Sequence, residues 1–196
     1  MPSTTSARPP GRPRAGVNAV VFAATLSTVH ELGYARATVE RIAAVAGVAK
    51  STVYRRWPSK GELIVDCLLD AFGPVPLEEG VGRAELMSSA IRWIAGKIGE
   101  PGVGDAFAGV FSDAVSDPAL REILSARLQD PYRLALQDAL GEPESRVLFF
   151  IDVVVGALLH RMGMTGVPMV DADVAALVEM VLPHFTDGPG PARPVR

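Results

Sequence analysis

Apolar side chains in the first third of the chain recur every three or four positions, the spacing that places them on one face of an α-helix. The longest run covers residues 15–32 and ends at Gly33, and its face consists of Val17, Val21, Ala24, Thr28 and Leu32. Shorter runs follow at 39–46, 50–57 and 59–71. The pattern therefore predicts four consecutive helices.

Residues that end and start helices mark the limits of these segments. Pro58 stops the third predicted helix, and Ser59 with Glu62 forms a capping box that starts the fourth. A Pro/Gly-rich acidic connection follows at 73–82. We therefore predict two helical domains between a disordered basic arm and a disordered tail: the arm at 1–14, the domains at 15–72 and 83–187, and the tail at 188–196.

The second domain is predicted to be helical throughout. Periodicity and end signals predict helices at 83–99, at 104–115, at 118–140 with Pro131 as a candidate break, at 144–163 and at 171–185. No segment shows the sustained alternation of a β-strand, and the sequence contains no internal repeat or coiled-coil heptad. The predicted fold class is all-α.

The helix predicted at 144–163 is apolar nearly all round, and Gly156 and Ala157 would let another helix approach closely. Its uncharged core, residues 153–159, is far too short to span a bilayer, so we interpret it as a buried helix and expect no membrane segment. One side is expected to pack inside the domain and another against a second copy of the chain. The helix at 171–185 would complete a four-helix interface in a homodimer.

Charge is distributed unevenly along the chain. Residues 1–61 contain nine basic and two acidic side chains, a net charge of +7, whereas the remaining residues sum to −10. The N-terminal part is therefore the part expected to bind a nucleic acid. No apolar signal segment is visible at the N-terminus, and the single cysteine, Cys67, allows no internal disulfide, so we expect a cytoplasmic location.

Two of the short helices have the arrangement of a helix-turn-helix. Residues 38–46 and 50–57 are joined by a glycine-containing turn at 46–49. Val53 and Trp57 stand four positions apart and are predicted to anchor the second helix inward. The side chains left outward can contact base edges and phosphates: Lys50, Ser51, Thr52, Tyr54 and Arg55.

The stretch that contains these helices, GYARATVERIAAVAGVAKSTVYRRWPSKGEL at residues 33–63, resembles the DNA-binding signature of the TetR family. The resemblance covers the first third of the chain. It implies a three-helix DNA-binding module with a helix-turn-helix, followed by a helical ligand-binding and dimerisation domain. It also implies repression of transcription that a small-molecule effector relieves.

The resemblance also assigns roles to individual positions. Gly47 falls on the turn of the family motif, and the following residues fall on positions where the family touches DNA: Thr38, Lys50, Ser51, Thr52, Tyr54, Arg55 and Lys60. Ala49 departs from the pattern, because members often have a serine there that caps the recognition helix, a contribution of about 1 kcal/mol. A two-fold dimer would place its recognition helices about 34–36 Å apart on a palindromic operator.

The basic arm contains a second candidate contact with DNA. Residues 10–14 resemble the Gly-Arg-Pro core of a minor-groove hook, with Arg12 and Arg14 as the candidate inserted side chains, although Pro10 stands where the full hook has an arginine. The alternative is a tail that only attracts the polyanion electrostatically. Both interpretations stay open.

Large apolar side chains in the second domain are candidates for the lining of an effector cavity. They are Met87, Trp93, Phe107, Phe111, Phe149 and Phe150, with His160 as a polar group. The alternative for each is that it fills the core. Cys67 lies on the apolar face of its helix and is expected to be a buried small hydrophobe.

No sequence motif favours catalysis, a cofactor or a metal. The chain has no nucleophile elbow, P-loop or dinucleotide fingerprint, and its three histidines lack metal-ligand spacing. We therefore expect a DNA-binding transcriptional regulator. Two alternatives stay open: a helical small-molecule binding or scaffold protein, and an architectural DNA binder without sequence specificity.

Overall fold

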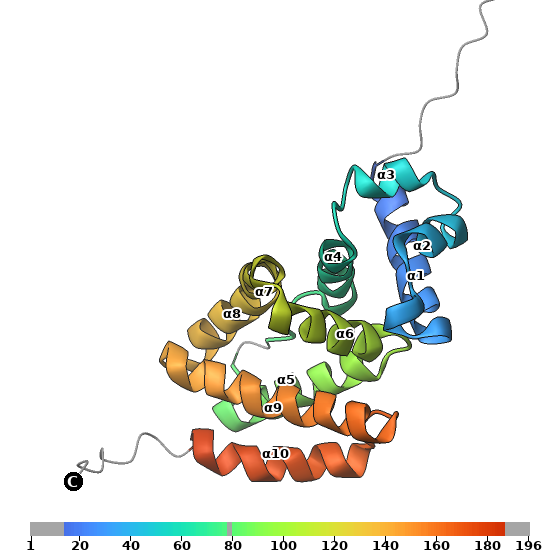
Figure 1. Cartoon of the computed structure of the whole chain (residues 1–196). Helices are drawn as coiled ribbons and strands as arrows, with labels where there is room; N and C mark the ends of the chain where they lie inside the picture. The colour runs from blue at the N-terminus through green and yellow to red at the C-terminus, as the bar shows by residue number, and fades with distance from the viewer. Residues whose placement is uncertain (1–13, 78–79, 187–196) are drawn as a thin grey trace, which may run out of the picture.

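The computed structural model describes residues 14–77 and 80–186, which contain helices and no β-strand. The predicted all-α fold is confirmed. Figure 1 shows α1 to α3 at one end of the molecule, the remaining helices at the other, and α4 between them. In chain order the helices are α1 (Arg14–Leu32), a 3₁₀ turn η1 (Tyr34–Arg36), α2 (Val39–Val45), α3 (Lys50–Tyr54), α4 (Lys60–Phe72), α5 (Arg83–Gly99), α6 (Val103–Ser116), α7 (Pro118–Leu124), a π-helical turn η2 (Ser125–Gln129), α8 (Asp130–Leu140), α9 (Glu144–Thr165) and α10 (Asp171–Thr186).

A small apolar core holds α1 to α3 together. Val21 and Ile42 are fully buried in it, and the rings of Phe22 and Trp57 meet with centroids 5.5 Å apart. Cys67 from α4 closes the base of this core with 1% of its surface exposed, which confirms the predicted buried position. The N-terminal helices therefore have a hydrophobic core of their own.

Helix α4 contributes to this core and also to the larger one. Leu63 packs into the small core, whereas Ile64, Leu68 and Phe72 pack into the core formed by α5 to α10. Ser59 caps α4 by accepting a hydrogen bond from the Glu62 backbone N–H at 3.1 Å, as the capping-box pattern predicted. Apolar contacts therefore continue across the predicted boundary through α4.

The segment predicted as one helix at 118–140 is interrupted by the π-helical turn η2. The Asp130 N–H donates to the Ser125 carbonyl five residues earlier. Pro131 lies in the first turn of α8 and lacks an N–H, so the regular hydrogen-bond ladder cannot continue through it. The predicted break near Pro131 is therefore present, but the irregular part of the helix is the π-helical turn that precedes the proline.

Helix α9 is buried within the chain along one side only. Only Val147, Phe150, Val154 and Leu158 are buried, and 22% of its most apolar 18-residue window is buried within the chain. By length and composition alone α9 is also apolar enough to cross a membrane. As expected, one side of α9 packs inside the domain: α9 packs on α5, α6 and α8 along one stripe and leaves apolar surface open.

A buried carboxylate joins three parts of the C-terminal domain. Glu142, in the α8–α9 connection, is ion-paired with Arg83 at the start of α5 and with Arg146 on α9, and its side chain is 8% exposed. Arg146 also donates to the His184 carbonyl at 2.7 Å and lies over the Phe185 ring. This network fixes the end of the helical bundle that lies far from α3.

Candidate nucleic-acid interface and effector cavity

Helices α2 and α3 form the predicted helix-turn-helix. Thr38 caps α2, since its hydroxyl accepts the Arg41 backbone N–H at 3.3 Å. Gly47 lies in the turn with φ of 65°, a left-handed conformation that a residue with a side chain adopts only at a cost. The two helices pack against each other and against α1.

Recognition helix α3 has one buried face and one polar face. Val53 is fully buried and Trp57 is 3% exposed, so both predicted anchors are confirmed. No side chain caps α3 at Ala49, as expected for an alanine at this position. Four of the predicted outward residues are exposed and Thr52 is half-buried; the exposed ones are Lys50, Ser51, Tyr54 and Arg55.

Glu40 contacts two of these polar side chains and was not among the predicted site residues. Its carboxylate forms an ion pair with Lys50 and accepts a hydrogen bond from the Tyr54 hydroxyl at 3.4 Å. The bond to Lys50 lowers the pKa of Glu40 and raises that of Lys50, so both are charged near neutral pH. The carboxylate therefore engages the Lys50 ammonium and the Tyr54 hydroxyl, which could otherwise bind a DNA phosphate. The sequence offered one sign of this role, because Glu40 is one of only two acidic residues in the basic N-terminal part.

Lys60 lies at the start of α4 and contacts Tyr34. Its ammonium group donates to the Tyr34 carbonyl at 3.1 Å and lies 3.7 Å from the centroid of that ring. Burial lowers the pKa of Lys60, although the nearby Asp113 carboxylate acts in the opposite direction. The Tyr34 hydroxyl donates to Asp113 on α6 at 2.6 Å. Lys60 therefore connects the end of the helix-turn-helix to the C-terminal domain.

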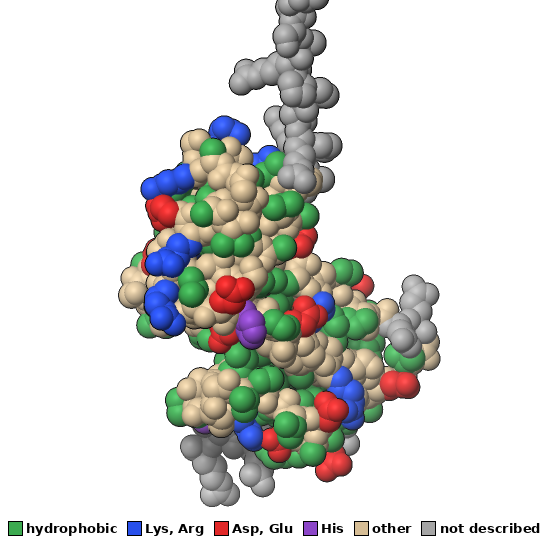
Figure 2. Space-filling model, turned by 90° about the vertical axis from the view of Figure 1, so that its right-hand side faces the viewer, with side chains coloured by type: hydrophobic (Ala, Val, Ile, Leu, Met, Phe, Trp, Pro, Cys, Tyr) green, Lys and Arg blue, Asp and Glu red, His purple; other side chains and the backbone are tan. Residues whose placement is uncertain are grey.

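The basic side chains gather on the N-terminal part of the molecule. Figure 2 shows Lys and Arg side chains along one edge of its upper part, which α1 to α3 form, whereas basic and acidic groups are mixed below. The structure describes no side chain before residue 16. Arg12 therefore lies outside the described residues, and of Arg14 only the backbone is described, as the first residue of α1.

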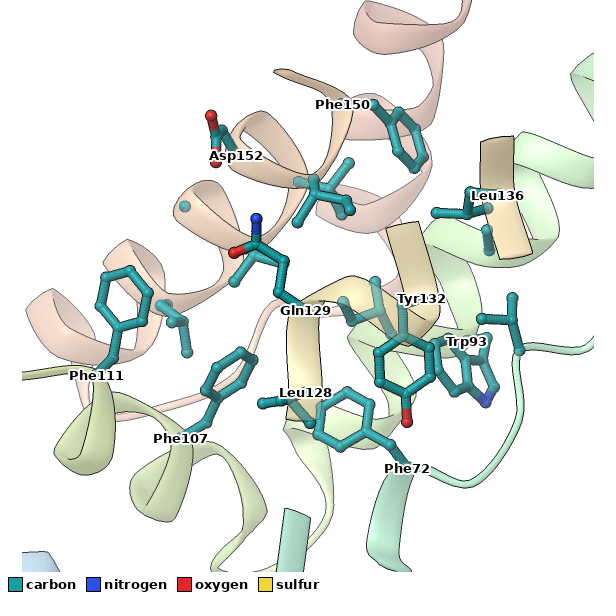
Figure 3. Close-up of a pocket in the computed structure, with 18 of the residues that line it drawn as sticks. Phe72, Trp93, Phe107, Phe111, Leu128, Gln129, Tyr132, Leu136, Phe150 and Asp152 are labelled. Carbon is teal, nitrogen blue, oxygen red and sulfur yellow. The ribbon is translucent and has the colours of Figure 1, made fainter. Parts of the chain in front are cut away.

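A cavity of about 370 Å³ lies between the helices of the C-terminal domain. Figure 3 shows aromatic rings from α4, α5, α6 and α8 around it, with α9 on the opposite side. Its volume is within the range of small-molecule sites. The lining is mainly apolar and consists of Phe72, Val75, Ala90, Trp93, Ile94, Phe107, Phe111, Leu124, Leu128, Gln129, Tyr132, Leu136, Phe150, Ile151, Asp152, Val154, Val155, Gly156 and Leu159.

Comparison with known proteins agrees with this arrangement. Residues 21–67 match the family model described as "Bacterial regulatory proteins, tetR family". The HTH-type transcriptional regulator Rv1556 of Mycobacterium tuberculosis is 30% identical over 181 residues, which are 87% of this chain and 88% of that protein. The DNA-binding transcriptional repressor TetR of Mycobacteroides abscessus is 30% identical over 175 residues, 84% of this chain and 91% of that one. This chain belongs to the TetR family.

Solved TetR-family structures share the fold. A regulator from Mesorhizobium loti superposes with a TM-score of 0.67 at 16% identity, covering 89% of this chain and 97% of the other. The fatty acid degradation regulator FadR of Bacillus halodurans superposes with a TM-score of 0.64 at 18% identity, covering 91% and 98%. The protein is therefore an HTH-type transcriptional regulator, and the TetR family is not a family of enzymes.

The cavity of this TetR-family regulator contains some of the predicted lining residues and excludes others. Trp93, Phe107, Phe111 and Phe150 line it. The other three candidates do not: Met87 is 1% exposed in the core, Phe149 is 59% exposed, and His160 is exposed on α9. These three residues therefore lie outside the lining of this cavity.

Sequence reasoning missed the lining residues of η2 and α8. Leu128, Tyr132 and Leu136 form one row at four-residue spacing, and this row was the signal that could have identified Tyr132. Gln129 and Asp152 gave no such signal. Their position at the cavity depends on how η2 and α9 pack in three dimensions.

Proposed function

We propose that this regulator is a homodimeric repressor that binds a palindromic operator through α3 and releases it when a small molecule occupies the cavity. The polar face of α3, held outward by the buried Val53 and Trp57, is the observation that carries the proposal. The name of the Mycobacteroides abscessus relative supports the repressor role. Membership in a family of bacterial regulatory proteins also supports a cytoplasmic location, because the bacterial chromosome lies in the cytoplasm.

The proposed DNA contacts are those that the family resemblance assigns. Lys50 and Arg55 offer donors to guanine or phosphate, and Thr38 and Tyr54 would fix the register on the backbone. Ser51, Thr52 and Lys60 complete the set. Arg12 and Arg14 would enter the adjacent minor groove or attract the duplex as a basic tail.

Open apolar surface on the last two helices supports the dimer. Phe149 on α9 and Met180 on α10 are 59% and 70% exposed in the single chain. A two-fold interface brings the same patch of both subunits together, so α9 and α10 would form a four-helix contact. Such an interface also accounts for the apolar character of α9 without a membrane.

Helix α6 supports a link between the cavity and the DNA-binding module. Phe107 and Phe111 line the cavity from α6, while Asp113 accepts a hydrogen bond from Tyr34. Gly109 lies so close to the Tyr34 ring that a side chain at this position would overlap it. An effector that favours another position of α6 would change the orientation of α3, and the coupling energy is its difference in affinity for the two states.

The deciding experiment is selection of bound sequences from a random duplex library at physiological salt, with the full-length protein. Enrichment of a palindromic motif is expected. Uniform recovery, with affinity falling steeply as salt rises, would indicate an architectural binder, and no recovery would indicate a scaffold protein. Sedimentation equilibrium tests the dimer independently, since a monomer at all micromolar concentrations would contradict the proposed interface.

A further inference from the structure

Charge is almost absent from the cavity. Its described lining contains no Lys, Arg or His, and the single ionisable carboxylate is that of Asp152. Asp152 is exposed, and Figure 3 shows it at the edge of the cavity, away from Tyr132 and Trp93. A buried anion would therefore lose its hydration without meeting a cation, and the one nearby charge would repel it.

One polar group inside the cavity lacks a partner. The half-buried Gln129 side chain projects into the cavity from η2, and its amide has no side-chain hydrogen bond to any residue that the structure describes (Figure 3). The Tyr132 hydroxyl, by contrast, already donates to the Gly73 carbonyl at 2.8 Å. A ligand oxygen at Gln129 would accept a hydrogen bond from an amide that no described residue pairs.

The remaining lining suits flat ring systems. The Phe72 ring meets Trp93 and Phe107 edge to face, with centroids 5.7 Å and 5.8 Å away, and Trp93 lies 5.6 Å from Tyr132. Aromatic ligands gain from such offset and edge contacts beyond the area that they bury. An aromatic ligand with an ammonium group would gain less binding free energy. The exposed Asp152 would hold that group at the solvent edge, where ion pairs contribute little.

We propose that the cavity binds an uncharged, mainly aromatic or polycyclic molecule with one hydrogen-bonding oxygen, which pairs with the Gln129 amide. This inference rests on the proposed function, since it names the class of effector. It selects against carboxylates and phosphates, and against lipophilic amines.

Three probes with the same ring system and different charge test the ligand class. Isothermal titration calorimetry of the full-length protein near neutral pH compares 2-naphthalenemethanol, 2-naphthoate and 2-naphthylmethylammonium. We expect the alcohol to have a dissociation constant at least about tenfold lower than either ion. Equal or tighter binding of the carboxylate or the ammonium compound would overturn the proposal, and so would the failure of all three to bind.

A variant then tests the role of Gln129. Gln129→Leu is expected to raise the dissociation constant of 2-naphthalenemethanol about fivefold to tenfold and to leave that of 2-methylnaphthalene unchanged or lower. The matched control is Gln137→Leu on α8, because Gln137 does not line the cavity. Equal losses for the alcohol and the hydrocarbon would show that Gln129 only shapes the cavity, and would overturn its assigned role.

The ligand class and the proposed function can be rejected independently, because the titrations use no DNA. If the selection enriches an operator but none of the probes binds as expected, only the proposed ligand class is rejected. Selective probe binding without any enriched operator would reject the repressor instead.

Discussion

Arg127 on the π-helical turn forms an ion pair with Asp66 on α4. The other carboxylate oxygen of Asp66 accepts the indole N–H of Trp57 at 2.8 Å. Arg127 directly precedes Leu128 and Gln129, which line the cavity, and Trp57 anchors the end of the helix-turn-helix. Asp66 therefore connects the cavity wall to the DNA-binding module. π-Helical turns are frequent at functional sites, and this one has contacts on both sides.

Arg127→Ala is expected to raise the dissociation constant for the selected operator about twofold to tenfold, because the module loses a contact that fixes its orientation. Thermal stability should change little, since the Arg127 side chain is 44% exposed and exposed pairs contribute about 0–1 kcal/mol. The operator affinity is measured over a series of salt concentrations. A slope reduced by about one unit would mean that Arg127 touches a phosphate directly, contrary to its assigned position.

Tyr54→Ala is expected to weaken operator binding with fold and dimer intact, because the side chain is exposed on the polar face of α3. Fluorescence anisotropy with the selected operator measures the loss, and circular dichroism with sedimentation checks the fold. Unchanged affinity would contradict the docking of α3. Lys50→Ala is the companion variant: a salt slope flatter by about one unit indicates a phosphate contact, whereas a changed base preference indicates a base contact.

Glu40→Gln is expected to increase affinity for every duplex, because the substitution removes a negative charge and replaces the ion pair with Lys50 by a weaker hydrogen bond. At low salt we expect a gain of about threefold to tenfold on operator and random DNA alike. Glu31→Gln, the other acidic position in the first 61 residues, provides the control. A gain restricted to the operator would instead place Glu40 at a base edge.

The sequence predicted those features that depend on neighbouring residues. Val53 and Trp57 stand on one face of α3, so their burial followed from helical spacing. The adjacent Phe149 and Phe150 show where this reasoning stops: Phe150 lines the cavity and Phe149 faces away. Both lie on an apolar helix, and only the packing of α5 and α6 against α9 decides which ring points inward.

Contacts between residues far apart in the sequence could not be predicted either. Asp66 and Arg127 are 61 positions apart, and nothing in their local sequence pairs them. The position of η2 shows a related limit. Pro131 indicated that the helix would be irregular. The structure accommodates the proline by i→i+5 hydrogen bonding that begins at Ser125, and this position depends on the surrounding packing.

Cys67 gives a prediction about pH. Burial raises the pKa of its thiol to about 12, with smaller contributions from Asp70 and Asp66, whereas the unfolded thiol has a pKa of about 8.5. Above about pH 8.5 the unfolded state loses this proton and the folded state keeps it, so stability is retained below that pH and falls as pH rises toward the folded pKa.

Urea denaturation of the wild type and Cys67→Ala at several pH values measures this effect. The free energy of unfolding of the wild type is expected to fall relative to the variant by about 1 kcal/mol per pH unit between about pH 9 and about pH 11. Parallel curves for the two proteins would show that the thiol is exposed in the folded state.

The Glu142 network leads to the largest expected change in stability. Glu142→Ala would leave Arg83 and Arg146 close together without the carboxylate that pairs with both, and breaking a buried ion pair costs about 3–5 kcal/mol. Glu144→Ala is the matched control two positions away, since Glu144 is 61% exposed and its pair with Arg133 spans 3.5 Å. For the control we expect a loss below about 1 kcal/mol.

Chemical denaturation of both variants gives the two free energies. Because the network joins α5, α9 and the end of α10, its loss is expected to weaken the proposed α9–α10 dimer contact as well, which sedimentation would detect as a higher dissociation constant. Equal, small losses in the two variants would mean that water replaces the Glu142 carboxylate at little cost. The network would then have no special part in holding the end of the bundle together.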